Sequence, residues 1–253
     1  MDWGVSDNKK IADYSGGVVS LSNALNDAAM CLTLMEKRLI FFCIAEINSI
    51  KSRHQQTNDF KISVVDFAEL YNLPVASTYQ ELRRITIGIM KKQWEYVELD
   101  NRGNDVIRRR QWLTACDYHK NEGWVRVKFS GEVAPYLTLL RTQFTSYRLE
   151  QASALRSLYS WRLLEKLMQF ENDGKGWWAV EIEDFCRIME ATEKQKTDFA
   201  KIRTKIIEPA IKELTEKDGW SIEYTTIKAG RKVISLRFDF QRVPPKPLLT
   251  QDA

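Results

Sequence analysis

The densest group of side chains that could bind a ligand lies between Lys194 and Leu214 (KQKTDFAKIRTKIIEPAIKEL). The first half of this stretch gathers five cations around one acid, Asp198: Lys194, Lys196, Lys201, Arg203 and Lys205. Cations are disfavoured near a helix N-terminus, because the macrodipole is already positive there. Phosphate is the obvious ligand to offset this cost, through backbone N–H groups and side chains together. A solvated surface helix is the alternative, and the neighbouring elements must decide between the two.

An amphipathic helix followed by a β-hairpin is predicted to carry these cations. Apolar residues recur at steps of three and four and therefore share one helix face: Phe199, Ile202, Ile206, Ala210 and Leu214. Pro209 removes a backbone donor and should bend the helix, either as a tolerated packing kink or as curvature that fits a groove. Strands are predicted at 220–227 and 232–240. The turn between them is basic and contributes Lys228, Arg231 and Lys232.

The same order of elements is predicted twice along the chain. In the second half, a helix, a strand and a short helix precede the basic helix, at 153–170, 177–182 and 185–189. In the first half, the predicted elements are helices at 32–50, 67–71, 77–93 and 132–140, and strands at 60–65, 95–99, 106–115 and 124–129. Asp66 and Asp184 occupy matching positions in Val65-Asp66-Phe67 and Glu183-Asp184-Phe185, where each is expected to cap a short helix. Such long-period similarity indicates two copies of one supersecondary unit.

A short helix, a turn and a second helix form a helix-turn-helix, and the hairpin after it forms a wing. The predicted fold class is therefore α+β and helix-rich, with two tandem winged-helix domains related by internal duplication. The predicted organisation is a flexible arm at 1–23, winged-helix domains at 24–141 and 142–240, and a disordered tail at 241–253. The second domain is expected to do most of the DNA reading.

A helix-turn-helix places its second helix in the major groove, which turns the basic stretches into candidate DNA contacts. Arginine can donate two bonds to guanine, and threonine can meet a thymine methyl. Candidates in the second half are Lys194, Lys196, Lys201, Arg203, Thr204, Lys205, Lys228, Arg231 and Lys232. Candidates in the first half are Thr78, Gln80, Arg83 and Arg84 on the second helix, and Arg102 at the tip of the hairpin assigned as its wing. Which of them read bases and which hold phosphate stays open.

Other classes of function find little support in the sequence. The 253 residues carry 38 basic and 34 acidic side chains, a net charge of +4, which proves no nucleic-acid partner by itself. There is no C-x-x-C, no G-x-x-x-x-G-K-[ST] and no paired histidine, so we expect no catalytic residues, metal or cofactor. Four scattered cysteines are expected to be buried free thiols, and the tryptophans core residues rather than base-stacking platforms. Without an apolar run of ~20 residues, the protein is expected to be soluble and cytoplasmic, with no membrane partner.

Three segments resemble the iteron-binding plasmid replication initiators, theta-type initiators with two winged-helix domains. They are LTLMEKRLIFFCIAEI (32–47), FTSYRLEQASALRSLYSWRLLEKLMQF (144–170) and IRTKIIEPAIKEL (202–214) with the wing IKAGRKVISLRFDF (227–240). The resemblance implies that a monomer binds directly repeated iterons in double-stranded DNA. It also implies that a dimer, formed through the N-terminal domain, binds an inverted repeat and represses its own gene. Host replication proteins, such as a helicase or initiator, are the further implied partners.

The resemblance places the base-reading cluster of the family on Arg203, Thr204 and Lys205, with further contacts from Thr78, Arg83 and Arg84. Threonine stands where many relatives carry a second basic residue, so a different base preference is expected there. A winged-helix transcriptional repressor without a role in replication is the alternative, and it shares every DNA-binding feature. A third hypothesis, from another class of protein, is a replication enzyme that nicks DNA. A strand-cleavage assay with metal would distinguish such an enzyme from an initiator that only binds DNA.

Overall fold

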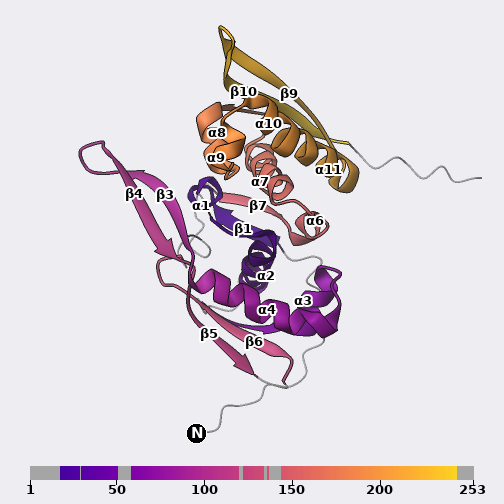
Figure 1. The fold of residues 1–253 in the computed structure, drawn as a ribbon. Coiled ribbons are helices and arrows are strands. Elements are labelled where there is room, and N and C mark those ends of the chain that lie inside the picture. Colours follow the sequence, from indigo (N-terminus) through magenta and orange to yellow (C-terminus); the bar gives the residue numbers. More distant parts are fainter. Residues whose placement is uncertain are drawn as a thin grey trace, which may run out of the picture.

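A computed structural model of the chain describes residues 18–28, 30–50, 58–119, 122–133, 136 and 144–243. Two halves lie one above the other, with the hairpin at 220–242 at the top of Figure 1 and the hairpin at 113–129 at the bottom. The first half begins with β1 (Val18–Ser22), α1 (Asn23–Asp27) and α2 (Leu34–Ile50). It continues with β2 (Asp59–Ser63), α3 (Val64–Leu70), α4 (Val75–Met90), β3 (Gln93–Leu99), β4 (Asp105–Gln111), β5 (Leu113–His119) and β6 (Trp124–Phe129).

The second half begins with β7 (Phe144–Arg148), α6 (Leu149–Ser153) and α7 (Leu158–Asn172). It continues with β8 (Trp177–Glu181), α8 (Ile182–Ile188), α9 (Glu193–Lys196) and α10 (Phe199–Ile202). A π-helical segment (Arg203–Ile207) then leads directly into α11 (Glu208–Asp218), and the half ends with β9 (Trp220–Ala229) and β10 (Lys232–Arg242).

The two halves share one sheet topology, as the predicted duplication requires. The strand orders are β2–β6–β5 and β8–β10–β9, so in each half the first strand pairs with the last, and the remaining strand lies at the edge. Ile62 pairs with Val125 in the first half, and Val180 pairs with Leu236 in the second. Each sheet packs with a short helix and a longer helix, which confirms the prediction of two winged-helix domains.

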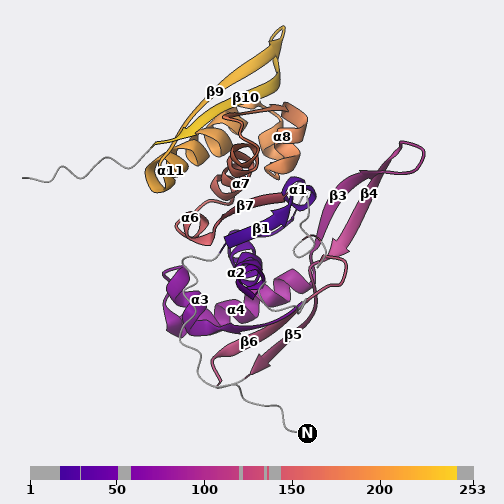
Figure 2. The same ribbon diagram turned by 180° about the vertical axis from the view of Figure 1, so that it is seen from behind.

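The strand order identifies a different hairpin as the wing of the first half from the one predicted. By strand order, β5–β6 corresponds to β9–β10, whereas β3 and β4 form a two-stranded sheet of their own. The β3–β4 hairpin is thus an addition between α4 and the wing, and it projects away from the body (Figures 1 and 2). Assigning Arg102 to the wing was therefore wrong, because Arg102 lies in the turn between β3 and β4. The single strand predicted at 106–115 is likewise two strands, β4 and β5, which belong to different sheets.

Several predicted boundaries were also wrong, for local physical reasons. Ser63, not Asp66, caps α3, since its hydroxyl accepts from the backbone N–H of Asp66. At α8, Glu181 rather than Asp184 is the N-cap residue. The helix predicted at 153–170 begins at Leu158, where Ser157 supplies the cap, and α6 precedes it. The start of the disordered tail predicted at 241–253 was wrong, because Gln241 and Arg242 still belong to β10 and pair with Ser221 and Trp220. The helix predicted at 132–140 lies mostly outside the described residues, and the tail beyond 243 lies wholly outside them.

The flexible arm predicted at 1–23 is wrong from Val18 onward. Val18–Ser22 forms β1, which pairs antiparallel with β7 at the start of the second half. Val19 and Leu21 are fully buried, and Ser20 shares a hydrogen bond of 2.7 Å with Ser146. The hydrophobic burial of β1 explains why it is ordered. Residues 1–17 lie outside the described ranges.

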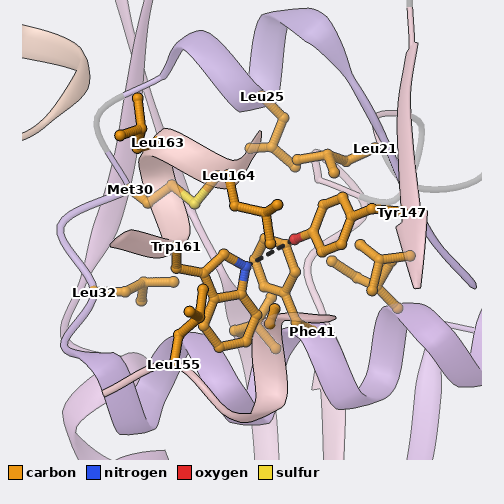
Figure 3. Packing of buried hydrophobic residues seen from close by; sticks show 14 of the residues in the cluster. Leu21, Leu25, Met30, Leu32, Phe41, Tyr147, Leu155, Trp161, Leu163 and Leu164 are labelled. Carbon is orange, nitrogen blue, oxygen red and sulfur yellow. Dashed lines mark hydrogen bonds between the residues drawn. The ribbon is translucent and has the colours of Figure 1, made fainter. Parts of the chain in front are cut away.

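One hydrophobic core runs through both halves. At its centre, Leu21 from β1, Phe41 from α2 and Trp161 from α7 lie together (Figure 3). The Trp161 indole N–H donates to the Tyr147 hydroxyl at 2.8 Å, so both aromatic polar groups are satisfied inside the core. Trp94, Trp112 and Trp220 are also fully buried. Most tryptophans are thus core residues, although Trp177 is exposed.

A buried ion pair joins the two halves beside this aromatic cluster. Lys37 of α2 lies 2.6 Å from Glu165 of α7, and both side chains are excluded from solvent. Burial lowers the pKa of Lys37 to about 8, although the attraction of Glu165 opposes the shift. Tyr147 donates to the other carboxylate oxygen of Glu165 at 3.0 Å. Because a buried charge without a partner is costly, an arrangement of the halves that separated Lys37 from Glu165 would be disfavoured.

A second set of polar contacts holds the loop before α2 against the second half. The carboxylate of Glu190, which follows α8, accepts from the backbone N–H groups of Met30 at 2.6 Å and Cys31 at 2.9 Å. The same oxygen forms an ion pair with the buried Arg162 of α7. Within the described residues, no helix is long and apolar enough to span a membrane.

Candidate nucleic-acid interface

The basic stretch that was predicted to be one helix is divided. Lys194 and Lys196 lie on the short α9, and the chain turns at Thr197 and Asp198 before α10 begins. Asp198 ends the first segment because its carboxylate caps α10, accepting from the backbone N–H of Ala200 at 2.9 Å. The lysines of α9 therefore flank the N-terminus of the recognition helix instead of forming its first turn.

Pro209 is accommodated by a π-helical segment directly before it. The backbone N–H of Glu208 donates to the carbonyl of Arg203, which is the wider hydrogen-bond spacing of a π-helix. Proline cannot donate this bond itself and would clash with the preceding turn of a regular α-helix. The wider turn leaves Arg203, Thr204 and Lys205 exposed while Ile206 and Ile207 stay buried. The predicted disturbance at Pro209 is thus a π segment within a continuous helix.

A groove runs between α8, the start of the recognition helix and the β9–β10 wing, with a volume of about 1150 Å³. Six cations line it, against the two carboxylates of Glu183 and Asp198: Arg187, Lys196, Arg203, Lys228, Arg231 and Lys232. The fold thus brings five of the predicted residues to one groove. Thr204 and Lys205 are exposed on the recognition helix outside the lining of the groove, as is Lys201 one turn earlier.

Few of these cations are neutralised within the protein. Arg203 has a loose ion pair with Glu208, at 3.6 Å between Nε and Oε1, and Lys196 contacts Glu193 at 2.8 Å. Lys201 donates to the Thr197 hydroxyl at 3.0 Å, and Thr204 donates to the carbonyl of Ala200 at 2.8 Å. The other candidates form no ion pair with any described residue: Lys194, Lys205, Lys228, Arg231 and Lys232. Of the six cations that line the groove, Lys228, Arg231 and Lys232 thus have no ion pair among the described residues, and their positive potential suits a polyanion.

The first half carries a groove at the corresponding place, between α3, α4 and the β5–β6 wing. Gln80 and Arg83 line this groove, as predicted for a recognition helix. Thr78 does not, because it is only 2% exposed and its hydroxyl donates to the carbonyl of Pro74 at 2.8 Å. The prediction that Thr78 contacts DNA is therefore wrong. Arg84 is exposed but donates two bonds to Glu81, at 2.9 and 2.5 Å.

Sequence reasoning missed several residues that line the two grooves, among them Arg187, Val65 and Val75. Arg187 of α8 joins the basic groove, although its ion pair with Asp184 resembles an ordinary surface contact. Val65 and Val75 line the first groove, and no sequence period distinguishes exposed valines from core valines. In the part of the chain that the structure describes, no three His, Cys, Asp or Glu side chains could hold a metal ion.

Comparison with known proteins agrees with this architecture. A protein of Escherichia coli described as "Uncharacterized 27.6 kDa protein" is 24% identical, with 90% of this chain and 95% of that protein covered. The Escherichia coli "PI protein" is 24% identical, with 86% and 80% covered. The crystal structure of Pi initiator protein in complex with iteron DNA matches with a TM-score of 0.71 at 20% identity, covering 89% of this chain and 97% of that one. The similarity to this crystal structure shows that the two chains share a fold.

Two family descriptions match the chain in tandem. Residues 18–168 match "Initiator Replication protein, WH1", and residues 181–240 match "Initiator Rep protein, WH2". The first match begins at β1 and ends within α7, so it spans the junction that was predicted to separate the domains. Together the matches cover most of the described fold, including both grooves. The chain therefore belongs to the family of replication initiator proteins, with a WH1 and a WH2 winged-helix domain in sequence.

Proposed function

We propose that this initiator binds directly repeated iterons in the double-stranded DNA of a plasmid origin, as a monomer, and starts replication there. The observation that carries the proposal is the pair of winged-helix grooves, of which the second is lined by six cations and two carboxylates. Phosphate contacts would supply affinity, and the two recognition helices would supply sequence reading. The similarity to a protein crystallised with iteron DNA supports the same assignment.

Within this proposal, the exposed residues have separate roles. Arg203, Thr204 and Lys205 face the base edges, and the cations around them hold phosphates: Lys194, Lys196, Lys201, Lys228, Arg231 and Lys232. In the first half, Gln80 and Arg83 face the bases. Arg84 and Arg102 lie outside the groove and contribute at most to the general positive potential. The chain needs no metal and cleaves no strand in this scheme, since its task is to bind and position DNA.

We further propose that a dimer, formed through the N-terminal domain, binds an inverted repeat and represses the initiator gene. The β3–β4 hairpin offers a suitable surface, because Val97, Leu99 and Ile107 are exposed on one face of it. Val97 pairs with Ile107 across the two strands, and neither strand pairs with a third strand among the described residues. An open edge with an apolar face favours pairing with a second copy. Host replication proteins such as a helicase or an initiator would join the DNA-bound monomer in the bacterial cytoplasm.

A footprint on the DNA that flanks the gene tests both roles, with the protein held first as monomer and then as dimer. We expect the monomer to protect tandem direct repeats and the dimer to protect an inverted repeat. A double variant that combines Arg203→Ala with Lys205→Ala should weaken both footprints. The control variant Lys212→Ala, on the exposed C-terminal part of the same helix, should leave them unchanged. Protection of an inverted repeat by dimer alone would instead identify a repressor. Metal-dependent strand cleavage would identify a nicking enzyme.

A further inference from the structure

The two winged-helix grooves occupy corresponding places but differ in chemistry. The first, of about 740 Å³, is lined from α3, α4 and the β5–β6 wing, and Arg83 is its single cation among the described lining residues. Six cations line the second. Val65, Val75 and Tyr79 make the first groove largely apolar. A groove that only gripped phosphate would not need this composition, because apolar side chains do not bind phosphate.

Two valines are exposed in this groove without a role in the core. Val65 is 50% exposed on α3, and Val75, the first residue of α4, is 49% exposed. The core beneath is already formed by buried neighbours on the same helices, including Val64, Phe67 and Leu82. Scattered exposed valines are ordinary, but these two lie at the mouth of one groove, where a recognition helix begins.

We propose that the first winged helix reads thymine methyl groups, with Val75 and Val65 as the residues that determine this specificity. The C5-methyl of thymine projects into the major groove, where an apolar side chain recognises it by contact. The N-terminal residues of a recognition helix are those that reach base edges, and Val75 holds that position on α4. The inference deepens the proposed function, on which it rests. It assigns thymine-containing DNA to the N-terminal half-site.

The surroundings of the valines favour DNA over a protein partner. Gln80 and Arg83 line the same groove, and their amide and guanidinium groups suit the base edges and phosphates beside a thymine. The wall of the groove is fixed, because the Tyr118 hydroxyl from the wing donates to the carbonyl of Arg83 at 3.0 Å. Two valines also offer far less apolar surface than the ~800 Å² per partner of a stable protein interface.

The test replaces thymine with deoxyuridine, which lacks only the methyl group, at each position of the footprinted site. Wild-type protein should lose about fourfold in affinity at one or two positions of the N-terminal half-site, the effect of one buried methyl group. Val75→Ala should lose a similar factor on the thymine site and become indifferent to the methyl at one of these positions. Val65→Ala should do the same at a neighbouring position.

Ile87→Ala is the matched control, because Ile87 is also exposed on α4, at 44%, but does not line the groove. It should keep the full methyl sensitivity, and circular dichroism should show that all three variants are folded. The inference fails if wild type is insensitive to the methyls, or if all variants keep the same sensitivity. It also fails if Val75→Ala changes self-association in sedimentation instead of methyl reading. A missing footprint would overturn the proposed function itself, which separates the two failures.

Discussion

Arg203 combines the two properties that a base-reading residue needs, a free donor face and a defined position. Its ion pair with Glu208, at 3.6 Å, is too loose to hold the guanidinium away from DNA. It also lies at the start of the π segment, where the helix is wider and the side chain is half exposed. The sequence alone was enough to choose Arg203, Thr204 and Lys205 as candidate base-reading residues. The π spacing that presents them could not be predicted in this way, because it depends on how Pro209 is packed.

Arg203→Ala should reduce binding to the specific site by about 1–3 kcal/mol and relax the sequence preference at one position. The reason is the loss of a bidentate contact that discriminates one base from another. Competition binding against single-base variants of the site would measure it, with Lys212→Ala as the control. Equal losses on specific and random DNA would show instead that Arg203 holds a phosphate.

Glu46 provides a prediction at the same scale that does not involve DNA. Burial, with a smaller contribution from Asp66, raises its pKa from 4.5 to about 7. The folded state therefore binds more protons than the unfolded state between these values, so stability falls as the pH rises from about 4.5 to 7. Glu46→Gln removes this dependence and should be more stable than wild type at pH 8, by about 3 kcal/mol.

Urea titrations of both proteins from pH 4.5 to pH 8 would check this prediction. The free-energy difference between the two should be close to zero at pH 4.5 and should grow toward neutral pH. Other groups titrate in both proteins, so the difference isolates Glu46. Parallel stability curves across this range would contradict the assignment.

At the scale of elements, the sequence was sufficient wherever a pattern was local. The amphipathic period over 199–214 and the turn at Gly230 and Arg231 predicted the recognition helix and its wing, and both are confirmed. The same reasoning chose the wrong hairpin in the first half, because β3–β4 follows α4 directly and has a good turn of its own. Strand order settles this choice, since β6 pairs with β2 and β3 pairs only with β4 among the described strands.

The two hairpin tips should therefore differ in their effect on DNA binding. Lys228→Ala should weaken binding to all sequences and reduce the slope of log affinity against log salt by about 1, because one phosphate contact is lost. Arg102→Ala changes the charge equally, but at the turn of the added hairpin, and it should leave the slope nearly unchanged. Filter binding over a range of salt concentrations would measure both. An unchanged slope for Lys228→Ala would exclude the second wing from the interface.

At the scale of the whole molecule, the junction between the halves lay beyond what sequence patterns reveal. Lys37 and Glu165 belong to helices from different halves, and each fits its helix as an ordinary surface residue would. Their burial follows from packing between α2, β7 and α7, which no local period encodes. The Cys43 and Cys186 thiols are buried, as predicted, but Cys31 is exposed where the loop before α2 meets Glu190.

Lys37→Met should destabilise the protein by about 3–5 kcal/mol, because it leaves the buried carboxylate of Glu165 without its ion-pair partner. Adding Glu165→Gln removes that charge while keeping an acceptor for Tyr147, so the double variant should recover part of the loss. Thermal and urea unfolding of the single and double variants would measure the coupling. Additive losses would show that the two side chains do not act as a pair.

The pairing of β1 with β7 has a consequence for how the protein folds while it is synthesised on the ribosome. Ser20 and its partner Ser146 are separated by 126 positions, so β1 is synthesised long before the strand that completes it. At ~5–20 residues per second, the interval is roughly 6–25 s. During that time the apolar side chains Val19 and Leu21 have no β7 to cover them. The nascent first domain therefore stays unfinished until translation has entered the second, and a chaperone has a defined window in which to bind it.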